Sequence, residues 1–213
     1  METGRVALAM PERLNIVDNE GVLTHGCDQE WYGLPWQRLA GCGPTVATNL
    51  LLYLARAGVI GLPLPVGGRQ DARRLMDLVW RSVTPSMHGV NKTSHFCRGL
   101  AHFCEAHHLP LVCESLDVPR KAATRPALAE VLAFVAEALA DDSPVAFLNL
   151  HNGEVENLDD WHWTTLVALE TDSNGARATI YDNGVELTID LALWLATTTL
   201  GGGFARLRRA ARG

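Results

Sequence analysis

The chain has 213 residues, of which 47% are hydrophobic, and it carries a formal net charge of -6 at pH 7. That length and apolar content suffice for one well-buried core, so we expect a single domain over residues 1–213. The acidic residues are scattered and there is no basic stripe to neutralise phosphates, which excludes nucleic acid as a partner. No apolar run reaches the roughly 18 to 20 residues that a membrane span requires.

The first two thirds of the chain are predicted to be mainly helical. Alternation of Val6, Leu8 and Met10 indicates a short strand, after which residues 15–37 carry turn formers and aromatics without helical period, typical of a long ordered loop. Apolar residues at helical spacing then predict four helices, at about residues 42–57, 71–82, 94–107 and 125–140.

Strand signals dominate after Pro144. Strand-like runs lie at residues 145–150, 163–170, 177–181 and 204–207, with turns at 152–153 and 172–175 and a tight turn at the glycine run 201–203. Helices followed by antiparallel strands, without alternating βαβ units, predict an α+β fold.

The most specific segment is a Gly-rich turn that delivers Cys42 to the beginning of an apolar helix. The unpaired N–H groups and about half a positive charge at a helix N-terminus stabilise a thiolate and can hold an oxyanion. Gly41 and Gly43 keep side chains away from the sulfur, so that an acyl carbon can approach it. The Cys42 N–H and the Gln37 side-chain amide are candidate donors to the oxyanion. Cys42 is therefore the predicted nucleophile and the most reactive thiol.

A nucleophilic cysteine also needs a base, and His162 at the start of an apolar strand is the candidate. The third member of such a site orients the imidazole through its other nitrogen. Asp182 lies at the end of the following strand, where an antiparallel hairpin can bring it near His162. The predicted catalytic set is thus Cys42, His162 and Asp182, with Gln37 assisting.

This order of residues resembles the papain-like cysteine peptidases, and in particular bacterial enzymes similar to the bacteriocin-leader-processing (double-glycine) peptidase family. The segment Cys42–Thr45 followed by an aliphatic helix carries most of the resemblance, and residues 144–150 look like the family's strand before the histidine. The resemblance spans residues 37–184. It implies a papain-like fold, with the nucleophile at a helix start in a helical N-terminal part that packs on a C-terminal antiparallel sheet.

The sequence departs from the family pattern in two places. Gln37 lies five residues before Cys42, where six is usual, and Asn183 follows Asp182 where the family often has proline. Either Asp182 or Asn183 is therefore a candidate to orient His162. The chain also lacks a membrane span and a GxxxxGK[ST] phosphate loop, so leader cleavage coupled to export is not implied.

Three functions fit these residues. The favoured one is a hydrolase, either a peptidase or an amidase, which acts on a peptide or amide substrate through an acyl-thioester and needs no cofactor. The alternatives are a thiol-dependent acyltransferase or transglutaminase-like enzyme, and a catalytically idle peptide-binding module. Water and an amine compete for the same acyl-thioester, so the sequence does not separate the first two.

The remaining cysteines and histidines suggest other chemistry. Residues 95–108 contain two cysteines and four histidines, the residue types that bind zinc. The segment is also an amphipathic helix without a CxxC or HExxH spacing, so we expect no metal there. Residues 1–5 do not resemble the start of a secretory signal, so we expect a cytoplasmic protein. We therefore expect its five cysteines to be free thiols. The oligomeric state is left open.

Overall fold

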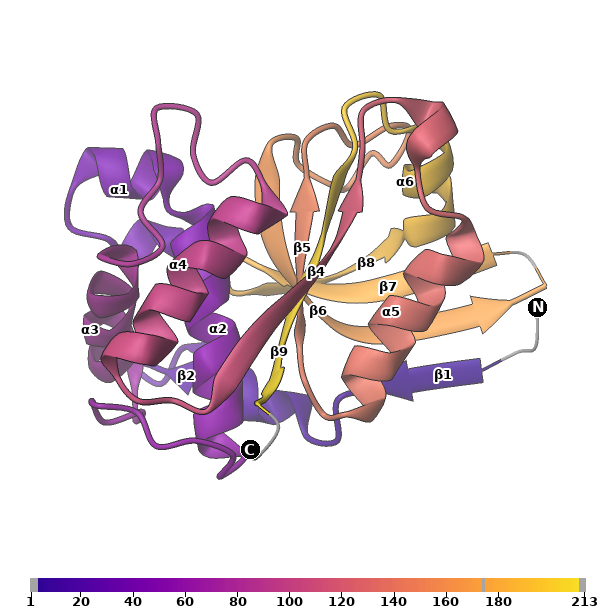
Figure 1. The fold of residues 1–213 in the computed structure, drawn as a ribbon. Helices are drawn as coiled ribbons and strands as arrows, with labels where there is room; N and C mark the ends of the chain where they lie inside the picture. Colours follow the sequence, from indigo (N-terminus) through magenta and orange to yellow (C-terminus); the bar gives the residue numbers. More distant parts are fainter. Residues whose placement is uncertain (1–3, 174, 211–213) are drawn as a thin grey trace.

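The molecule is built around a seven-stranded antiparallel sheet. The computed structural model describes residues 4–173 and 175–210 of the chain. The predicted α+β class is confirmed, because helices supplied mainly by the first part of the chain lie beside this sheet (Figure 1). The strands of the sheet, in spatial order, are β4 (Leu111–Val118), β9 (Gly202–Arg209), β5 (Val145–Asn149), β6 (His162–Asp172), β7 (Gly175–Asp182) and β8 (Val185–Asp190), with β1 (Gly4–Ala7) paired to β6.

Strand β6 is the longest strand and has neighbours on both sides. Its first part pairs with β5, its second part pairs with β1, and β7 runs along its other side. Residues 162–169 of β6 are all buried, as expected of a strand that is covered on both faces, where burial is continuous along the strand rather than alternating. The beginning of β6 is therefore fixed in the interior of the sheet.

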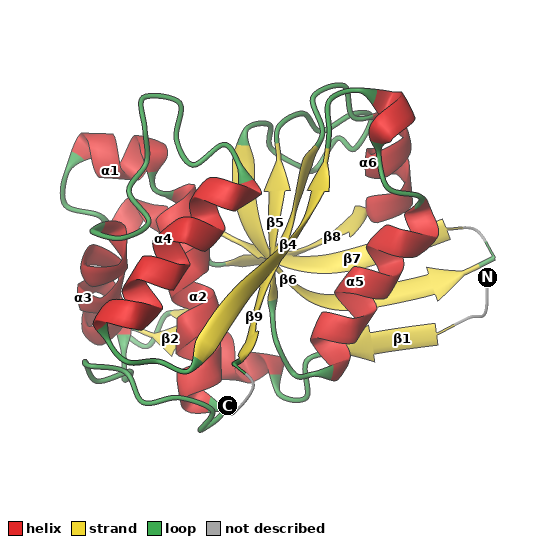
Figure 2. Ribbon diagram, in the orientation of Figure 1, coloured by secondary structure: helices red, strands yellow, loops and turns green. Residues whose placement is uncertain are grey.

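Most helices gather at one side of the molecule (Figure 2). These are α1 (Pro35–Ala40), α2 (Cys42–Arg56), α3 (Arg69–Trp80) and α4 (Thr93–Ala106), whereas α5 (Leu128–Ala140) and α6 (Leu191–Thr197) lie against the other part of the sheet. The four predicted helices correspond to α2, α3, α4 and α5, with ends shifted by three residues or fewer. Within residues 4–173 and 175–210, every helix falls short of the length and apolarity that crossing a bilayer requires.

The segment predicted as a loop between residues 15 and 37 contains regular structure. A two-stranded sheet forms from β2 (Asn15–Val17) and β3 (Leu23–His25), and α1 follows directly before α2. Strands of three residues and a helix of six are too short to produce a detectable period in the sequence. The structure therefore corrects the prediction here.

The predicted turn at the glycine run is also wrong, because Gly202 and Gly203 begin strand β9. A Cβ atom on Gly202 would lie 2.0 Å from the Leu148 carbonyl oxygen, and one on Gly203 would lie 2.7 Å from the Leu116 oxygen. Glycine is needed because the neighbouring backbones approach closely, rather than because the chain turns.

Three further elements were not predicted. Strand β4 is an edge strand whose residues are mostly half-exposed, and its polar side chains hide the strand period. Strand β8 follows the turn after Asp182 and forms a hairpin with β7, and the short helix α6 comes next in the chain. The predicted first strand is present but ends at Ala7 rather than Met10. The predicted turn at 172–175 includes residue 174, which lies outside the described residues. Residues 1–3, part of the segment 1–5 that does not resemble a secretory signal, also lie outside them.

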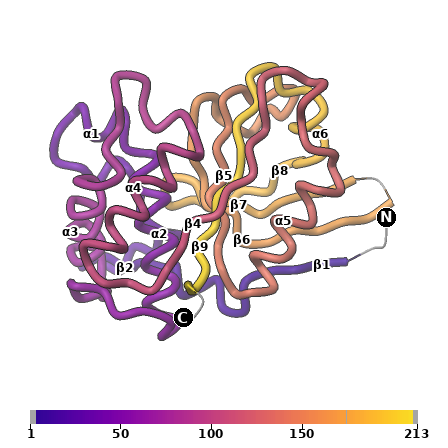
Figure 3. The backbone as a smooth tube through the Cα atoms, in the orientation of Figure 1, coloured from indigo at the N-terminus to yellow at the C-terminus, as the bar shows by residue number. Residues whose placement is uncertain are grey.

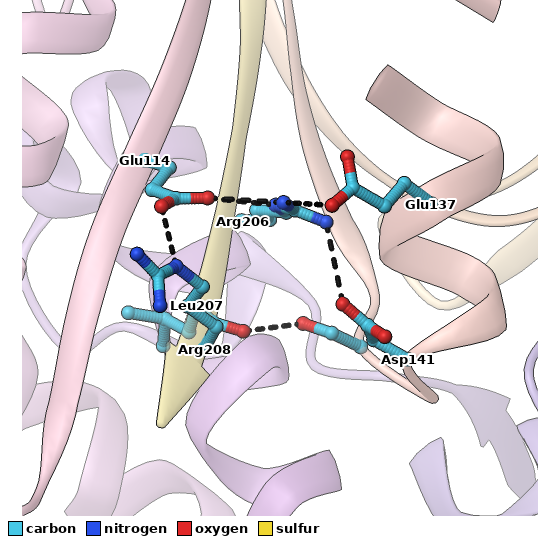
Figure 4. Close-up of polar contacts among 7 residues, drawn as sticks. Glu114, Glu137, Asp141, Arg206, Leu207 and Arg208 are labelled. Atoms are coloured by element: carbon cyan, nitrogen blue, oxygen red, sulfur yellow. Dashed lines mark hydrogen bonds and ion pairs between the residues drawn. The ribbon is translucent and has the colours of Figure 1, made fainter. Parts of the chain in front are cut away.

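A buried arginine ties β9 to its neighbours. The Arg206 side chain is 7% exposed, and its guanidinium lies 3.0 Å from Glu114 of β4 and 3.1 Å from Glu137 of α5 (Figure 4). Asp141, after α5, lies 3.5 Å away, and Arg208 forms a second ion pair with Glu114. Because these groups come from β4, β9 and the α5 region, the cluster joins three parts of the chain that are distant in sequence.

Candidate active site

Cys42 is the first residue of α2 and is partly exposed. The helix behind it is buried from Gly43 to Leu54, and its first turn is closed by a 2.9 Å hydrogen bond from the Thr45 N–H to the Gly41 carbonyl. The core therefore holds the helix while its N-terminal end, with the thiol, reaches the surface. This is the placement that the sequence predicted for a thiol exposed to the unpaired N–H groups of a helix start.

The glycines on either side of Cys42 are required by packing. A Cβ atom on Gly41 would lie 2.4 Å from the Gln37 carbonyl oxygen and 2.7 Å from the Tyr32 ring. One on Gly43 would lie 2.9 Å from the Val90 side chain. The sequence assigned these glycines to substrate access, and the structure adds a separate reason for them.

His162 and Asp182 lie side by side at one edge of the β6–β7 pair. His162 begins β6 and Asp182 ends β7, and antiparallel pairing brings these two ends together. The His162 Nε2 and Asp182 Oδ1 atoms are 2.7 Å apart, and the two side chains are 10% and 9% exposed. Since Nε2 is used by Asp182, Nδ1 is the ring nitrogen left for another partner.

The environment of His162 favours its protonated form. Burial lowers its pKa, but hydrogen bonds and charges from Asp182 and from the Cys42 side chain outweigh burial and raise the pKa to about 10. Because the Cys42 side chain is one of the groups that raise this pKa, it lies close to the His162 ring. The three residues therefore form one connected group, in which an imidazolium faces a sulfur and is held from behind by a carboxylate.

The turn after Asp182 separates the two candidates for orienting the imidazole. Asn183 and Gly184 have φ angles of 44° and 80°, and Asp182 pairs with Val185 across them. Two central residues with positive φ define a tight hairpin turn, which Asn-Gly favours. Asn183 thus forms the turn, and Asp182 makes the contact with His162. The Asn-Gly pair was the sequence signal for this hairpin, and the sequence-based prediction did not use it.

Gln37 lies on α1, the short helix that precedes Cys42. Its side-chain oxygen accepts a 3.4 Å hydrogen bond from the Leu34 N–H at the start of the same helix. This bond orients the amide and leaves its NH₂ group as a donor. The proposed role of Gln37 at an oxyanion remains a prediction.

The cysteines do not all remain free, and the prediction of five thiols is wrong. Cys97 of α4 and Cys113 of β4 form a disulfide, whereas Cys27, Cys42 and Cys104 are free thiols. The pairing depends on how α4 packs against β4, which the sequence did not predict as a strand. The disulfide weakens the argument for a cytoplasmic location, because cytosolic reductants keep most thiols reduced.

The disulfide also takes one cysteine from the candidate zinc segment at residues 95–108. Among the residues that the structure describes, no three or more His, Cys, Asp or Glu side chains come together as a metal site. The absence of metal at this segment stays a prediction.

We expect brief iodoacetamide treatment of the native, unreduced protein at pH 6 to label Cys42 almost exclusively. Burial raises the pKa of Cys27 to about 12 and that of Cys104 to about 11, so roughly one in 10⁵ or fewer of those thiols is ionised at pH 6. Cys42 is partly exposed and lies beside an imidazolium. Peptide mass spectrometry locates the label, and denatured protein, in which all three thiols react, is the control. Label mainly on Cys27 or Cys104, or a rate of Cys42 labelling that is unchanged in His162→Ala, would contradict the pair.

Comparison with known proteins gives a similarity in fold. No protein-family model matches the chain, and no curated protein matches it. Among solved structures the chain is similar to UfSP from C. elegans, a cysteine protease of papain-like fold, with a TM-score of 0.51 and 9% sequence identity. The match covers 100% of this chain and 35% of the UfSP chain, so this chain spans about a third of the length of that protein.

A similarity at this level of identity describes the fold and not the activity. It does not support the narrower resemblance to the bacteriocin-leader-processing family. The helices beside an antiparallel sheet agree with the arrangement in UfSP. The chain therefore has an α+β fold similar to that of UfSP.

Proposed function

We propose that this protein is a cysteine hydrolase, a peptidase or amidase, in which Cys42 is the nucleophile and His162 the acid and base. The observation that carries the proposal is the connected group of Cys42, His162 and Asp182, with its sulfur at a helix start and its imidazole held at 2.7 Å by a carboxylate. The similarity of its fold to that of UfSP, a cysteine protease, supports the same proposal.

The proposed reaction begins with the Cys42 sulfur as a thiolate beside the His162 imidazolium. The sulfur attacks the carbonyl carbon of a peptide or amide, and the Cys42 N–H, with the Gln37 amide, donates to the oxyanion that develops. His162 gives its proton to the leaving nitrogen, the C–N bond breaks, and an acyl-thioester remains on Cys42. Neutral His162 then takes a proton from water, which attacks the thioester and releases the acid.

Asp182 acts on the orientation of the ring. Its bond to Nε2 directs Nδ1 toward the sulfur and stabilises the imidazolium that the first step needs. An acyltransferase would form the same thioester and differ only in the group that attacks it. The idle binding module is disfavoured, since a buried ion-pair network around one thiol has no evident use in binding alone.

The proposal is tested with p-nitrophenyl acetate, an activated ester that acylates a reactive thiolate without requiring the natural substrate. We expect a burst of p-nitrophenolate of about one equivalent, with the acetyl group found on Cys42 by mass spectrometry, followed by slower hydrolysis of the thioester. Cys42→Ser should lose the burst, while Cys104→Ser retains it. A burst that persists in Cys42→Ser, or no acetyl group on Cys42, would refute the assignment of the nucleophile.

A further inference from the structure

The connection between α3 and α4, residues 81–92, contains a hydrogen-bonded turn that the proposed mechanism does not use. Ser86 and Gly89 exchange backbone hydrogen bonds of 3.2 and 2.9 Å, and the Ser86 hydroxyl donates to the Gly89 carbonyl at 2.9 Å. Gly89 has a φ of 69°, which closes the turn. Met87 stands at its tip with 90% of its surface exposed. A large apolar side chain is thus presented to solvent at the tip of a hydrogen-bonded turn.

This turn is attached to both sides of the candidate active site. On the cysteine side, Val90 packs so closely against Gly43 that no Cβ atom fits between them. On the histidine side, the indole N–H of Trp163 donates to the Val90 carbonyl, and that of Trp161 donates to the His88 carbonyl at 3.1 Å. Both tryptophans are neighbours of His162 in the chain. The turn is therefore held beside the reacting pair.

The two tryptophans serve different purposes. Trp163 is 1% exposed and stacks on Phe96 with ring centroids 4.4 Å apart, so it belongs to the core. Trp161 is 45% exposed and has a φ of 56°, a conformation that residues other than glycine rarely adopt. That backbone holds the indole at the surface against the turn. We call Met87 and Trp161 the apolar wall.

The chemistry of the proposed reaction says which part of a substrate meets this wall. His162 must reach the leaving nitrogen to protonate it, so the amine side of the scissile bond lies on the His162 side of Cys42. Trp161 is adjacent to His162 and linked to the turn that carries Met87. We infer that the apolar wall binds a large apolar side chain on the amine side of the scissile bond, an inference that rests on the proposed function.

The inference can be tested without the natural substrate, because an amine that attacks the acyl-enzyme enters by the path along which the leaving amine departs. p-Nitrophenyl acetate first forms acetyl-Cys42 and p-nitrophenolate. The nitrogen of an added amino-acid amide then attacks the thioester carbon, the C–S bond breaks, the thiolate is restored, and the proton released by nitrogen passes to His162. The product is an N-acetyl amino-acid amide, which is measured against acetate.

Leucinamide and serinamide are the two acceptors, and acetyl-glutathione supplies the intrinsic ratio of their reactivities. Relative to that reference, we expect wild type to prefer leucinamide roughly tenfold, because its side chain is partly buried against the wall. Met87→Ser and Trp161→Asn should each reduce the preference to about twofold, asparagine being chosen because it tolerates a positive φ. Val112→Ser, at an exposed apolar residue on β4, should leave the preference unchanged.

The outcomes separate the two proposals. If wild type forms no acetyl-Cys42, the proposed function fails and the inference falls with it. If acetyl-Cys42 forms but leucinamide has no advantage, or the advantage survives both wall substitutions, the proposed function stands and the wall is not a binding site. Loss of preference in Met87→Ser alone already supports the inference, since a side chain that is 90% exposed contributes little to the stability of the fold.

Discussion

Replacing His162 with alanine is expected to lower turnover of p-nitrophenyl acetate by about a thousandfold or more. Without the imidazole, the Cys42 sulfur loses its ion-pair partner and water loses the base that activates it, and removal of such a group from a catalytic triad has effects of this size. Steady-state release of p-nitrophenolate measures turnover, and mass spectrometry should show acetyl-Cys42 persisting because deacylation is blocked.

Asp182→Ala should cost less, because a group that orients the ring leaves the ring itself in place. His102→Ala, at an exposed histidine on α4, is the matched control and should keep full turnover. Thermal unfolding of each variant verifies that the fold survives. Turnover of His162→Ala equal to that of wild type would remove His162 from the mechanism.

The second large effect concerns stability. Arg206→Gln should lower the free energy of unfolding by about 3 kcal/mol, because it removes the buried cation between Glu114, Glu137 and Asp141 and leaves their charges facing one another. The value lies at the lower end for a broken buried ion pair, since Glu137 and Asp141 are more than half exposed and water can solvate them. Urea unfolding of the variant and the wild type gives the difference.

Arg5→Gln is the matched control for Arg206→Gln. Arg5 pairs with Glu170 at 2.9 Å, but the two side chains are 64% and 47% exposed, and surface ion pairs contribute about 0 to 1 kcal/mol. If Arg5→Gln lowered the free energy of unfolding as much as Arg206→Gln does, burial would not be the reason for the large effect of Arg206.

Helices α2 to α5 were predictable because each carries a long apolar stripe. Helix α2 has buried residues along most of its length, and α5 is rich in strong helix formers, so period and propensity agree. The positions of Cys42 at a helix start and of His162 at a strand start followed from the same local patterns. Cys42 and His162, and the helix or strand on which each of them lies, could therefore be predicted from the sequence.

The parts that were missed depend on contacts between distant segments. Strand β4 has no clear period because it is an edge strand, and its disulfide partner Cys97 is in another element. The role of the glycines at 201–203 was misassigned because only the neighbouring backbones of β4 and β5 reveal why side chains do not fit. The α3–α4 turn lies beside His162 through two indole hydrogen bonds, which no local pattern encodes.

The position of β9 in the sheet has a consequence for synthesis on the ribosome. β9 is the last strand of the residues that the structure describes, yet it lies between β4 and β5 and runs through the middle of the molecule (Figure 3). Translation of the stretch from Asn149 to Arg209 takes roughly 3 to 12 s at about 5 to 20 residues per second. During that interval β4 and β5 have emerged or are emerging while each lacks the neighbour that satisfies one of its edges. Unpaired edges of this kind attract other strands, so the nascent chain is exposed to aggregation until β9 has been made and has paired with both.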